Sequence, residues 1–312
     1  MTALLRQPWI WSWLAALAVW LGIVGFTGGQ GGMGVITAAL TFAAFYVLVA
    51  LGQMFVVTLG PGNVDLSIPA CMTLAATVAM KLMAEANHLI LLGLAAAILV
   101  GLAVGAVNYA LIRLLSIPPI IATLSSSFLF QSAAIWYNRG LRIKPPRALA
   151  DFSTGMAFGI PSLAVVVLAV SLLLHLVLTR TIYGRRVLAI GQNPRAAKLA
   201  GVPVERIRAL TYVMCGLLAG LAGFLVAAFS GGAALNMGAE YLLSSIAVVV
   251  IGGTSVNGGF ANVPGLWGAA LFLFLLTTML NTFGLGADLR LILTGLVIIA
   301  VIVAASGRRT AP

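Results

Sequence analysis

Few side chains in this sequence could do chemistry, and they do not form a catalytic set. The 312 residues include six acidic residues, two histidines and two cysteines. Catalysis by an activated nucleophile, by paired carboxylates or by a metal needs several such groups at defined spacing, and the sequence shows no such spacing. A phosphate-binding loop of the Walker type is also absent, because no glycine is followed by lysine. We therefore expect no catalytic residue, no bound metal and no cofactor in this chain.

The most unusual polar segment is GPGNVDLSIP, residues 60–69, which lies between two apolar runs. Asp65 or Ser67 can cap the helix that follows by accepting hydrogen bonds from its free N–H groups. The segment can also face a cavity, because irregular backbone at membrane depth is tolerated only there or inside protein. The two interpretations are compatible.

A second segment, IGGTSVNGGFANVPG at 251–265, repeats this order of glycine, asparagine and proline before an apolar run. The similarity suggests an internal repeat of two halves, as in many transporters. Polar residues within apolar runs either bond neighbouring helices or line a path for a polar solute. The candidates for such a path are Asp65, Ser67, Asn108, Thr123 and Asn257.

Residues 180–208 form the longest polar interruption of the sequence, and they carry seven of its 17 basic residues. A basic loop this dense between membrane spans is expected on the cytoplasmic side. Asn193 can cap a short helix that begins with Pro194 and ends at Gly201. A second helix is expected from about Pro203, with an acid in its favourable first turn. We expect this loop to dock on a soluble partner and to pass its motion into the membrane.

The composition places most of the chain in a membrane. Hydrophobic residues make up 62% of the sequence, charged residues 7%, and the mean hydropathy is +1.15. A soluble protein contains roughly 25% charged residues. We therefore expect an all-α integral membrane protein whose apolar runs of about 20 residues cross the bilayer as helices. About ten spans are predicted, at 9–26, 35–58, a third ending near 84, 89–115, a fifth ending near 137, a sixth ending near 179, 210–229, an eighth from 241, 266–283 and 289–305.

The distribution of charge predicts how the chain is oriented. An even number of spans places both termini on one side, and eleven of the 17 basic residues then lie on that side, those of 180–208 included. The positive-inside rule identifies this side as the cytoplasm. The net charge of +11 does not indicate nucleic acid binding, because the basic residues lie in separate loops between spans. They suit anionic lipid headgroups and an acidic protein partner better.

Four basic residues contradict this charge rule, because they lie in the loop 138–159 on the expected outer side. They are Arg139, Arg142, Lys144 and Arg147. An ordinary solvated loop explains them. A docking surface that steers a partner with acidic groups is the alternative explanation.

Four stretches of the sequence resemble the ABC-transporter permeases that import ribose, xylose and galactose. They are GNVDLSIPACMTLAA, AVNYALIRLLSIPPIIATLS, YGRRVLAIGQNPRAAKLAGVPVERIRALTYVMCGLLAGLAG and IAVVVIGGTSVNGG. The sequence departs from the family in two places. Gly-Pro-Gly-Asn-Val stands where the family has Gly-Gly-Ile before DLS, and Tyr109 follows Asn108 where the family usually has glycine. Both departures lie near the expected path, and they would suit one member of an unequal pair of permeases.

The resemblance implies a subunit of a larger assembly in the bacterial inner membrane. The implied partners are a second permease, identical or paralogous, a cytoplasmic ABC ATPase that holds ATP and Mg²⁺, and a periplasmic sugar-binding protein. The resemblance also implies that the NPRAAKLAGV helix is the coupling element that enters a cleft of the ATPase, with one side kept thin by Ala196, Ala197 and Ala200. The implied coupling residues are Asn193, Pro194, Arg195, Ala196, Ala197, Lys198, Gly201 and Val202.

The predicted function is that of a single transmembrane permease domain, residues 1–312, which translocates a monosaccharide delivered by the binding protein. A nucleoside, a polyol or a furanoside signal is the near alternative for the solute. An ion-coupled secondary carrier is a more distant alternative, because such coupling usually needs membrane-embedded acids and Asp65 is the one candidate. A membrane enzyme is a third alternative, and it lacks a catalytic constellation.

Overall fold

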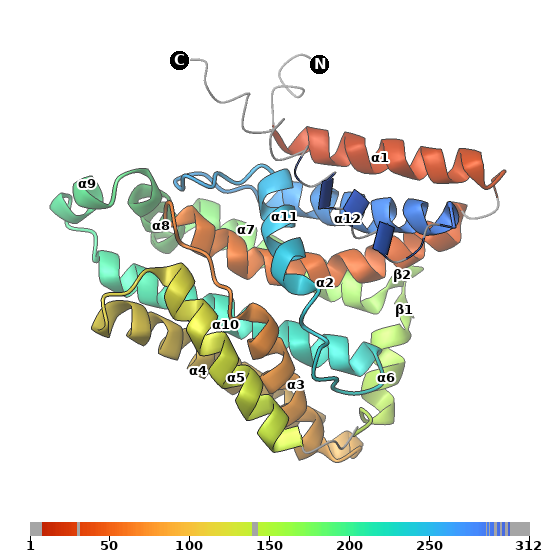
Figure 1. Ribbon diagram of the computed structural model, residues 1–312, viewed down its shortest axis with the longest axis horizontal. Helices are drawn as coiled ribbons and strands as arrows, with labels where there is room; N and C mark the ends of the chain where they lie inside the picture. Colours follow the sequence, from red (N-terminus) through yellow and green to blue (C-terminus); the bar gives the residue numbers. More distant parts are fainter. Residues whose placement is uncertain are drawn as a thin grey trace.

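The computed structural model describes residues 8–29, 32–138 and 143–284, together with scattered residues between 286 and 299. Nearly all of this chain is helical (Figure 1). The elements are α1 (Pro8–Phe26), α2 (Gly32–Thr58), α3 (Ile68–Met83), η1 (Asn87–Leu89), α4 (Ile90–Leu114), α5 (Pro119–Asn138), α6 (Arg147–Thr154), β1 (Met156–Ala157), β2 (Ile160–Pro161), α7 (Ser162–Arg180), α8 (Ile182–Gln192), α9 (Pro194–Leu199), α10 (Val204–Phe229), α11 (Tyr241–Ile251) and α12 (Val263–Thr282). The two strands form an antiparallel hairpin between α6 and α7.

Seven of the described helices are long and apolar enough to cross a bilayer. They are α1, α2, α4 with η1, α5, α7, α10 and α12. Two shorter apolar helices, α3 and α11, each adjoin a stretch without helix, residues 59–67 and 252–262. We call these stretches the first and second interrupted segments. The prediction of an all-α membrane protein is confirmed, whereas the predicted tenth span, 289–305, lies largely outside the described residues.

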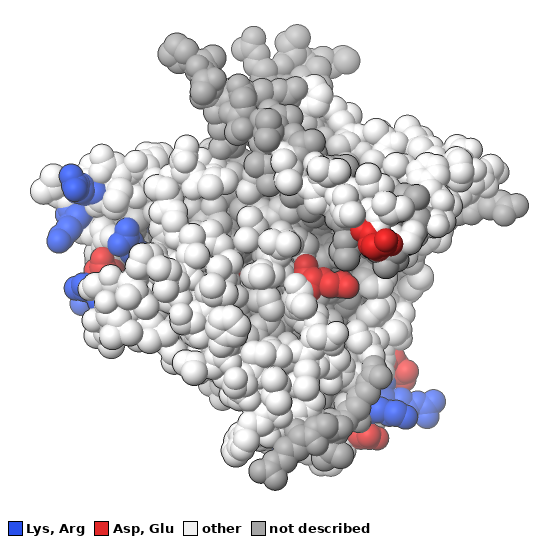
Figure 2. Space-filling model, in the orientation of Figure 1, with Lys and Arg blue, Asp and Glu red and all other residues white. Residues whose placement is uncertain are grey.

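Charged loops gather at two opposite ends of the molecule. α8 and α9 lie at one end, which we call the coupling end after the predicted role of α9 (Figure 1). α6 with the hairpin lies at the other, which we call the outer end after its predicted orientation. Figure 2 shows basic side chains at both ends, and between them a surface that is uncharged apart from a few acidic side chains. This is the distribution expected of a protein whose middle is covered by lipid.

α10 packs closely along α4 because small residues line both helices. Gly101 of α4 faces Gly216 of α10, and Gly105 faces Tyr212, at distances so short that a Cβ on either α4 glycine would overlap the backbone of α10. In lipid, small residues allow backbones to approach and van der Waals packing to stabilise the pair. The position of α10 relative to α4 is therefore fixed over several turns.

The basic loop contains more helix than predicted. α8 precedes α9 as a separate helix that was not predicted. The helix expected from about Pro203 is confirmed, since α10 begins at Val204, and it continues without a break into the span expected from about Leu210. Pro203 restricts the backbone just before the first turn, and Glu205 lies within that turn, where a negative charge is favourable. The polar start of α10 therefore extends the membrane span towards the coupling end.

Candidate functional site

The coupling helix predicted from the sequence is α9. The side chain of Asn193 accepts hydrogen bonds from the amides of Arg195 and Ala196, at 3.1 and 3.0 Å, and Pro194 occupies the first turn. These bonds satisfy two of the amides that a helix start leaves free. The predicted cap and the predicted start of the helix are confirmed.

The end of α9 determines which side chains face outward. Gly201 adopts a φ of +80°, as a left-handed closing turn requires, and the amide of Val202 donates to the carbonyl of Ala197 at 3.0 Å. Leu199 is 90% exposed and Ala197 only 5%. Residues two apart on a helix point in nearly opposite directions, so Ala197 faces its own chain. The prediction that Ala197 contributes to a thin outer side is wrong, and the outward Leu199 was missed.

α8 directly precedes α9 and packs on α10. The hydroxyl of Thr181 accepts a 3.2 Å hydrogen bond from the amide of Gly184 at the start of α8. The hydroxyls of Tyr183 and Thr211 share a 2.8 Å hydrogen bond between α8 and α10. Burial raises the pKa of Tyr183 to about 12, because the phenolate would lose its hydration. The phenol therefore keeps its proton, and its hydrogen bond, at physiological pH.

Three backbone segments meet at the end of α8 without side chains between them. A Cβ at Gly191 would overlap the carbonyl oxygen of Thr58 and the amide of Gly259, and a Cβ at Gly258 would overlap the backbone of Gly60. The amide of Gly259 donates to the carbonyl of Thr58 at 3.0 Å. We call Gly60, Gly191, Gly258 and Gly259 the glycine junction. It connects α8 directly to both interrupted segments, a contact that the sequence did not reveal.

Glu205 links the start of α10 to the end of α4. Its carboxylate accepts a 2.5 Å hydrogen bond from the hydroxyl of Tyr109, and it lies 3.5 Å from Nε of Arg113 and 3.6 Å from Nη1 of Arg208. These side chains are partly exposed, so each ion pair contributes only about 0–1 kcal/mol. Tyr109, one of the two departures from the family pattern, thus belongs to the coupling end of the molecule.

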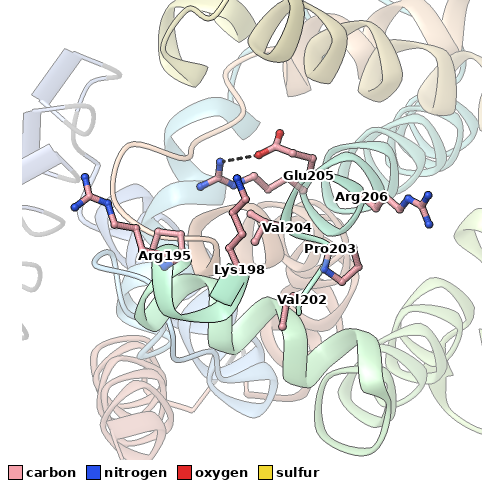
Figure 3. Close-up of a pocket in the computed structure, with 9 residues that line it drawn as sticks. Arg195, Lys198, Val202, Pro203, Val204, Glu205 and Arg206 are labelled. Atoms are coloured by element: carbon pink, nitrogen blue, oxygen red, sulfur yellow. Dashed lines mark ion pairs between the residues drawn. The ribbon is translucent and has the colours of Figure 1, made fainter. Parts of the chain in front are cut away.

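A pocket of about 450 Å³ opens between α9 and the start of α10 (Figure 3). Its lining residues are Pro194, Arg195, Lys198, Val202, Pro203, Val204, Glu205, Arg206 and Arg208. Four of them are cationic, and the acid, Glu205, is already paired with Arg208. Figure 3 shows Arg195 and Arg206 pointing away from each other on opposite sides of the pocket. Cations placed in this way suit separate acidic groups on a large surface better than one small anion.

A buried polar cluster joins the first interrupted segment to α4 and α5. Oδ1 of Asp65 accepts hydrogen bonds from the amide and the hydroxyl of Ser67, at 2.8 and 2.6 Å. Nδ2 of Asn108 donates to the Ser67 hydroxyl at 2.6 Å, and Oδ1 of Asn108 accepts from Ser126 at 2.5 Å. All four side chains are buried. The structure therefore brings three of the predicted path residues into one hydrogen-bonded group.

Two further side chains hold the backbone of this segment. Thr123, a predicted candidate, accepts from the amide of Leu66 at 3.0 Å, and Oε1 of Gln53 accepts from the amide of Asp65 at 3.3 Å. Gln53 was missed, although a glutamine inside an apolar run was a usable signal. The capping interpretation is wrong, because the hydroxyl of Ser67 donates to Asp65 and neither side chain caps α3. A proline in the first turn of α3 removes one amide that such a cap would serve.

Asn257 lies apart from the buried polar cluster. It is exposed on the turn of the second interrupted segment, directly before Gly258 of the glycine junction. Its role in a solute path stays a prediction.

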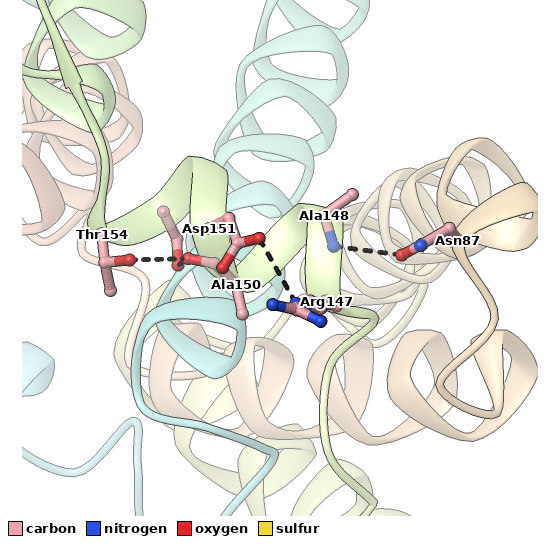
Figure 4. Close-up of polar contacts among 7 residues, drawn as sticks. Asn87, Arg147, Ala148, Ala150, Asp151 and Thr154 are labelled. Carbon is pink, nitrogen blue, oxygen red and sulfur yellow. Dashed lines mark hydrogen bonds and ion pairs between the residues drawn. The ribbon is translucent and has the colours of Figure 1, made fainter.

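The basic residues of the outer end are described only in part, because Arg139 and Arg142 lie outside the described residues. Lys144 is exposed. Arg147 begins α6 and forms an ion pair with Asp151 one turn later, at 3.9 Å (Figure 4). This pair offsets part of the positive charge on which the docking hypothesis depends, and docking at this loop stays a prediction.

Membrane-crossing helices, two interrupted segments and a folded basic loop at one end define the class, a multi-span integral membrane protein. Residues 35–302 match the family model described as branched-chain amino acid transport system / permease component. The chain belongs to this family.

Several curated proteins are similar over most of this chain. The ribose import permease protein RbsC of Escherichia coli (strain K12) is 32% identical over 262 residues, covering 81% of this chain and 79% of that protein. The autoinducer 2 import system permease protein LsrC of Enterobacter sp. (strain 638) is 31% identical, and the match covers 86% of this chain and 78% of that protein. The autoinducer 2 import system permease protein LsrD of Yersinia enterocolitica is 28% identical, and the match covers 96% of this chain and 92% of that protein. No solved structure matches the chain.

Proposed function

We propose that this chain is the permease subunit of an ATP-driven importer for a monosaccharide, which a binding protein delivers from outside the membrane. The similar proteins are named as permeases for ribose import and for autoinducer 2 import. Their identities of 32% and 31% do not separate the two solutes. A furanoside signal is therefore the second candidate.

The observation that carries the proposal is that α9 is a well-defined short helix exposed at the coupling end. The helix is capped at one end, closed by a left-handed glycine at the other, and exposes Leu199. Two cations on this helix, Arg195 and Lys198, and one on α10, Arg206, have no carboxylate within 4.0 Å among the described residues. The exposed Leu199 and these cations together suit a protein surface that has an apolar groove with acidic groups around it. We assign this surface to a cytoplasmic ATPase, which would hold ATP and Mg²⁺.

Through the glycine junction, a movement of α9 caused by docking would be passed on to the two interrupted segments. A displacement of α9 moves α8, and the end of α8 contacts both interrupted segments backbone to backbone. Backbone contacts contain no rotatable side chain that could absorb the movement. The first interrupted segment leads from Gly60 to Asp65 of the buried polar cluster within five residues. Movement at the coupling end therefore reaches the groups that we propose to line the solute path.

The four residues of the proposed path, Asp65, Ser67, Asn108 and Thr123, are all buried and bonded to one another or to backbone, so the path would be closed in this conformation. Opening it requires these hydrogen bonds to be exchanged for bonds to solute hydroxyls or water, which keeps buried polar groups satisfied. A second permease subunit would complete the path. The coupling end, with both termini, would face the cytoplasm of the inner membrane.

Reconstitution into vesicles with the ATPase and binding protein of its own transport system tests the function. We expect ATP-dependent uptake of labelled ribose that survives an uncoupler, with unlabelled autoinducer 2 as the competitor that separates the two candidates. Uptake that persists without ATP and stops with the uncoupler would instead identify an ion-coupled carrier.

A further inference from the structure

The hairpin β1–β2 has a bulky residue where a tight turn normally requires a small one. Ala157 pairs with Ile160, so Phe158 and Gly159 alone form the turn. Their φ angles are +55° and +77°. Two positive φ values are the requirement of a type I′ turn, whose positions favour asparagine, aspartate and glycine. A phenylalanine held in this strained conformation indicates a role beyond making the turn.

The side chain of Phe158 is not covered by any part of the chain that the structure describes. It is 102% exposed, and Met156 beside it is 62% exposed. Ile160 and Phe152 are exposed as well. We call these four residues the apolar tip. These side chains lie on both faces of the hairpin and on the end of α6. Contact of so many apolar side chains with water is unfavourable, so we expect a surface beyond the described residues to cover them.

Hydrogen bonds at the base of the hairpin and along α6 hold the apolar tip in place. At the base of the hairpin, the amide of Ser162 donates to the carbonyl of Gly155 at 3.0 Å. α6 is held to η1 by a 3.0 Å hydrogen bond from the amide of Ala148 to the side chain of Asn87 (Figure 4), and Leu149 is buried beneath it. The tip therefore has a defined position relative to the start of α7.

The length of α7 places the apolar tip at the membrane surface. Its 19 residues span about 28 Å at 1.5 Å per residue, close to the hydrocarbon thickness of about 30 Å. With Arg180 at the inner boundary, Ser162 lies near the outer boundary. The hairpin then lies in the headgroup layer, which is roughly 5–7 Å thick on each side. Residues 152–179 include no charged side chain that would oppose contact with lipid.

We propose that the apolar tip inserts into the headgroup layer of the outer leaflet and anchors the outer end of the molecule beside α7. The exposed leucines of α7, Leu168, Leu172 and Leu176, continue the apolar surface into the bilayer. Lipid would then cover Phe158, and the strain of the turn would be offset by transfer of its ring out of water.

A fluorescent probe on the tip tests this directly. Phe158→Cys is labelled with an environment-sensitive dye in the folded chain, where the native Cys71 and Cys215 are buried. The labelled chain is placed in vesicles of phosphatidylcholine and phosphatidylglycerol, with or without a lipid that is spin-labelled near its headgroup. We expect the spin-labelled lipid to remove most of the fluorescence. The matched control, Arg147→Cys on the exposed side of α6, should keep its fluorescence and be quenched by aqueous iodide instead.

A second pair of variants distinguishes loss of the apolar side chain from loss of the hairpin fold. Phe158→Asn places a residue that type I′ turns favour, so the hairpin should stay folded while the apolar side chain is lost. A dye at Met156→Cys should lose its quenching by lipid in the Phe158→Asn chain and keep it in the Phe158→Leu chain. Quenching of the Phe158→Cys probe by iodide and not by lipid would overturn the proposal. Shielding that appears only after extracytoplasmic proteins of the host are added would show a protein docking site instead.

Discussion

The amide of Gly259 donates a 3.0 Å hydrogen bond to the carbonyl oxygen of Thr58, which joins the second interrupted segment to the end of α2. Gly191, at the end of α8, packs against both residues so closely that it has no room for a side chain. One point of contact therefore connects the coupling end to both halves of the chain. Any change in the position of α8 has to be accommodated by both interrupted segments.

A methyl group at this point should uncouple the importer. Gly191→Ala would overlap the backbone of Thr58, at an overpacking cost of about 1–3 kcal/mol. We expect ATP hydrolysis by the assembled complex to continue while uptake falls by about 10-fold or more, which equals at least about 1.4 kcal/mol of lost coupling. Gly34→Ala, in open space on α2, is the matched control. Normal uptake by Gly191→Ala would mean that the junction does not transmit the movement.

The outward leucine of α9 should contribute to assembly and not to stability. Leu199→Asp places a charge where, in our proposal, an apolar group would meet the partner. An aspartate at an exposed position costs the folded chain little. We expect the ATPase to be lost from the immobilised permease, with an unchanged melting temperature. Ala200→Ser, at the exposed residue directly after this helix, should retain the ATPase. If Leu199→Asp binds the ATPase as well as the native chain does, α9 is not the docking element.

A bulky residue at Ala197 should lower the stability of the folded chain rather than block the partner directly, because this side chain faces its own chain. Ala197→Trp overfills a packed site, and we expect a loss of stability of about 1–3 kcal/mol. The melting temperature in detergent should fall before any effect on the partner is measured. An unchanged melting temperature would place Ala197 on the outer surface after all.

The buried polar cluster should tolerate loss of charge better than loss of its hydrogen bonds. Asp65→Asn keeps an oxygen that can accept from both donors of Ser67. Asp65→Ala leaves those donors without a partner, at a cost of about 1–3 kcal/mol. We expect most of the uptake to remain in Asp65→Asn and a clear loss of stability in Asp65→Ala. Abolished uptake with a shifted pH dependence in Asp65→Asn would restore a role for the carboxylate in transport.

Tyr183 should make the contact between α8 and α10 sensitive to alkaline pH only. Burial raises its pKa from 10.0 to about 12. A group whose pKa is raised on folding stabilises the folded state fully below its unfolded pKa, and this contribution is lost as pH rises towards the folded pKa. Between pH 7 and 9 the native chain and Tyr183→Phe should therefore show a constant difference in melting temperature. Above pH 10 the native chain should lose stability faster, and equal slopes would contradict the assignment.

The sequence by itself determined the class of protein and the local structure of α9. Lipid offers no hydrogen bonds, so long runs without charge have to form helices whatever they pack against. The cap by Asn193, the start at Pro194 and the turn at Gly201 involve residues within a few positions of one another. Such features depend on local backbone geometry and can be predicted without a fold.

Tertiary structure alone decided how these elements work together. The glycine junction joins residues around positions 58, 191 and 259, and no local pattern indicates that three glycine-containing stretches share one contact. The inward side of Ala197 depends on what α9 packs against, because a helix of six residues has too few turns to show a reliable apolar face. The hydroxyl of Ser67 could cap α3 locally, but it bonds to Asp65 because Asn108 and Ser126 complete a buried network around both. A buried polar side chain bonds to the partners that the surrounding helices offer, and these partners are known only once the helices are packed together.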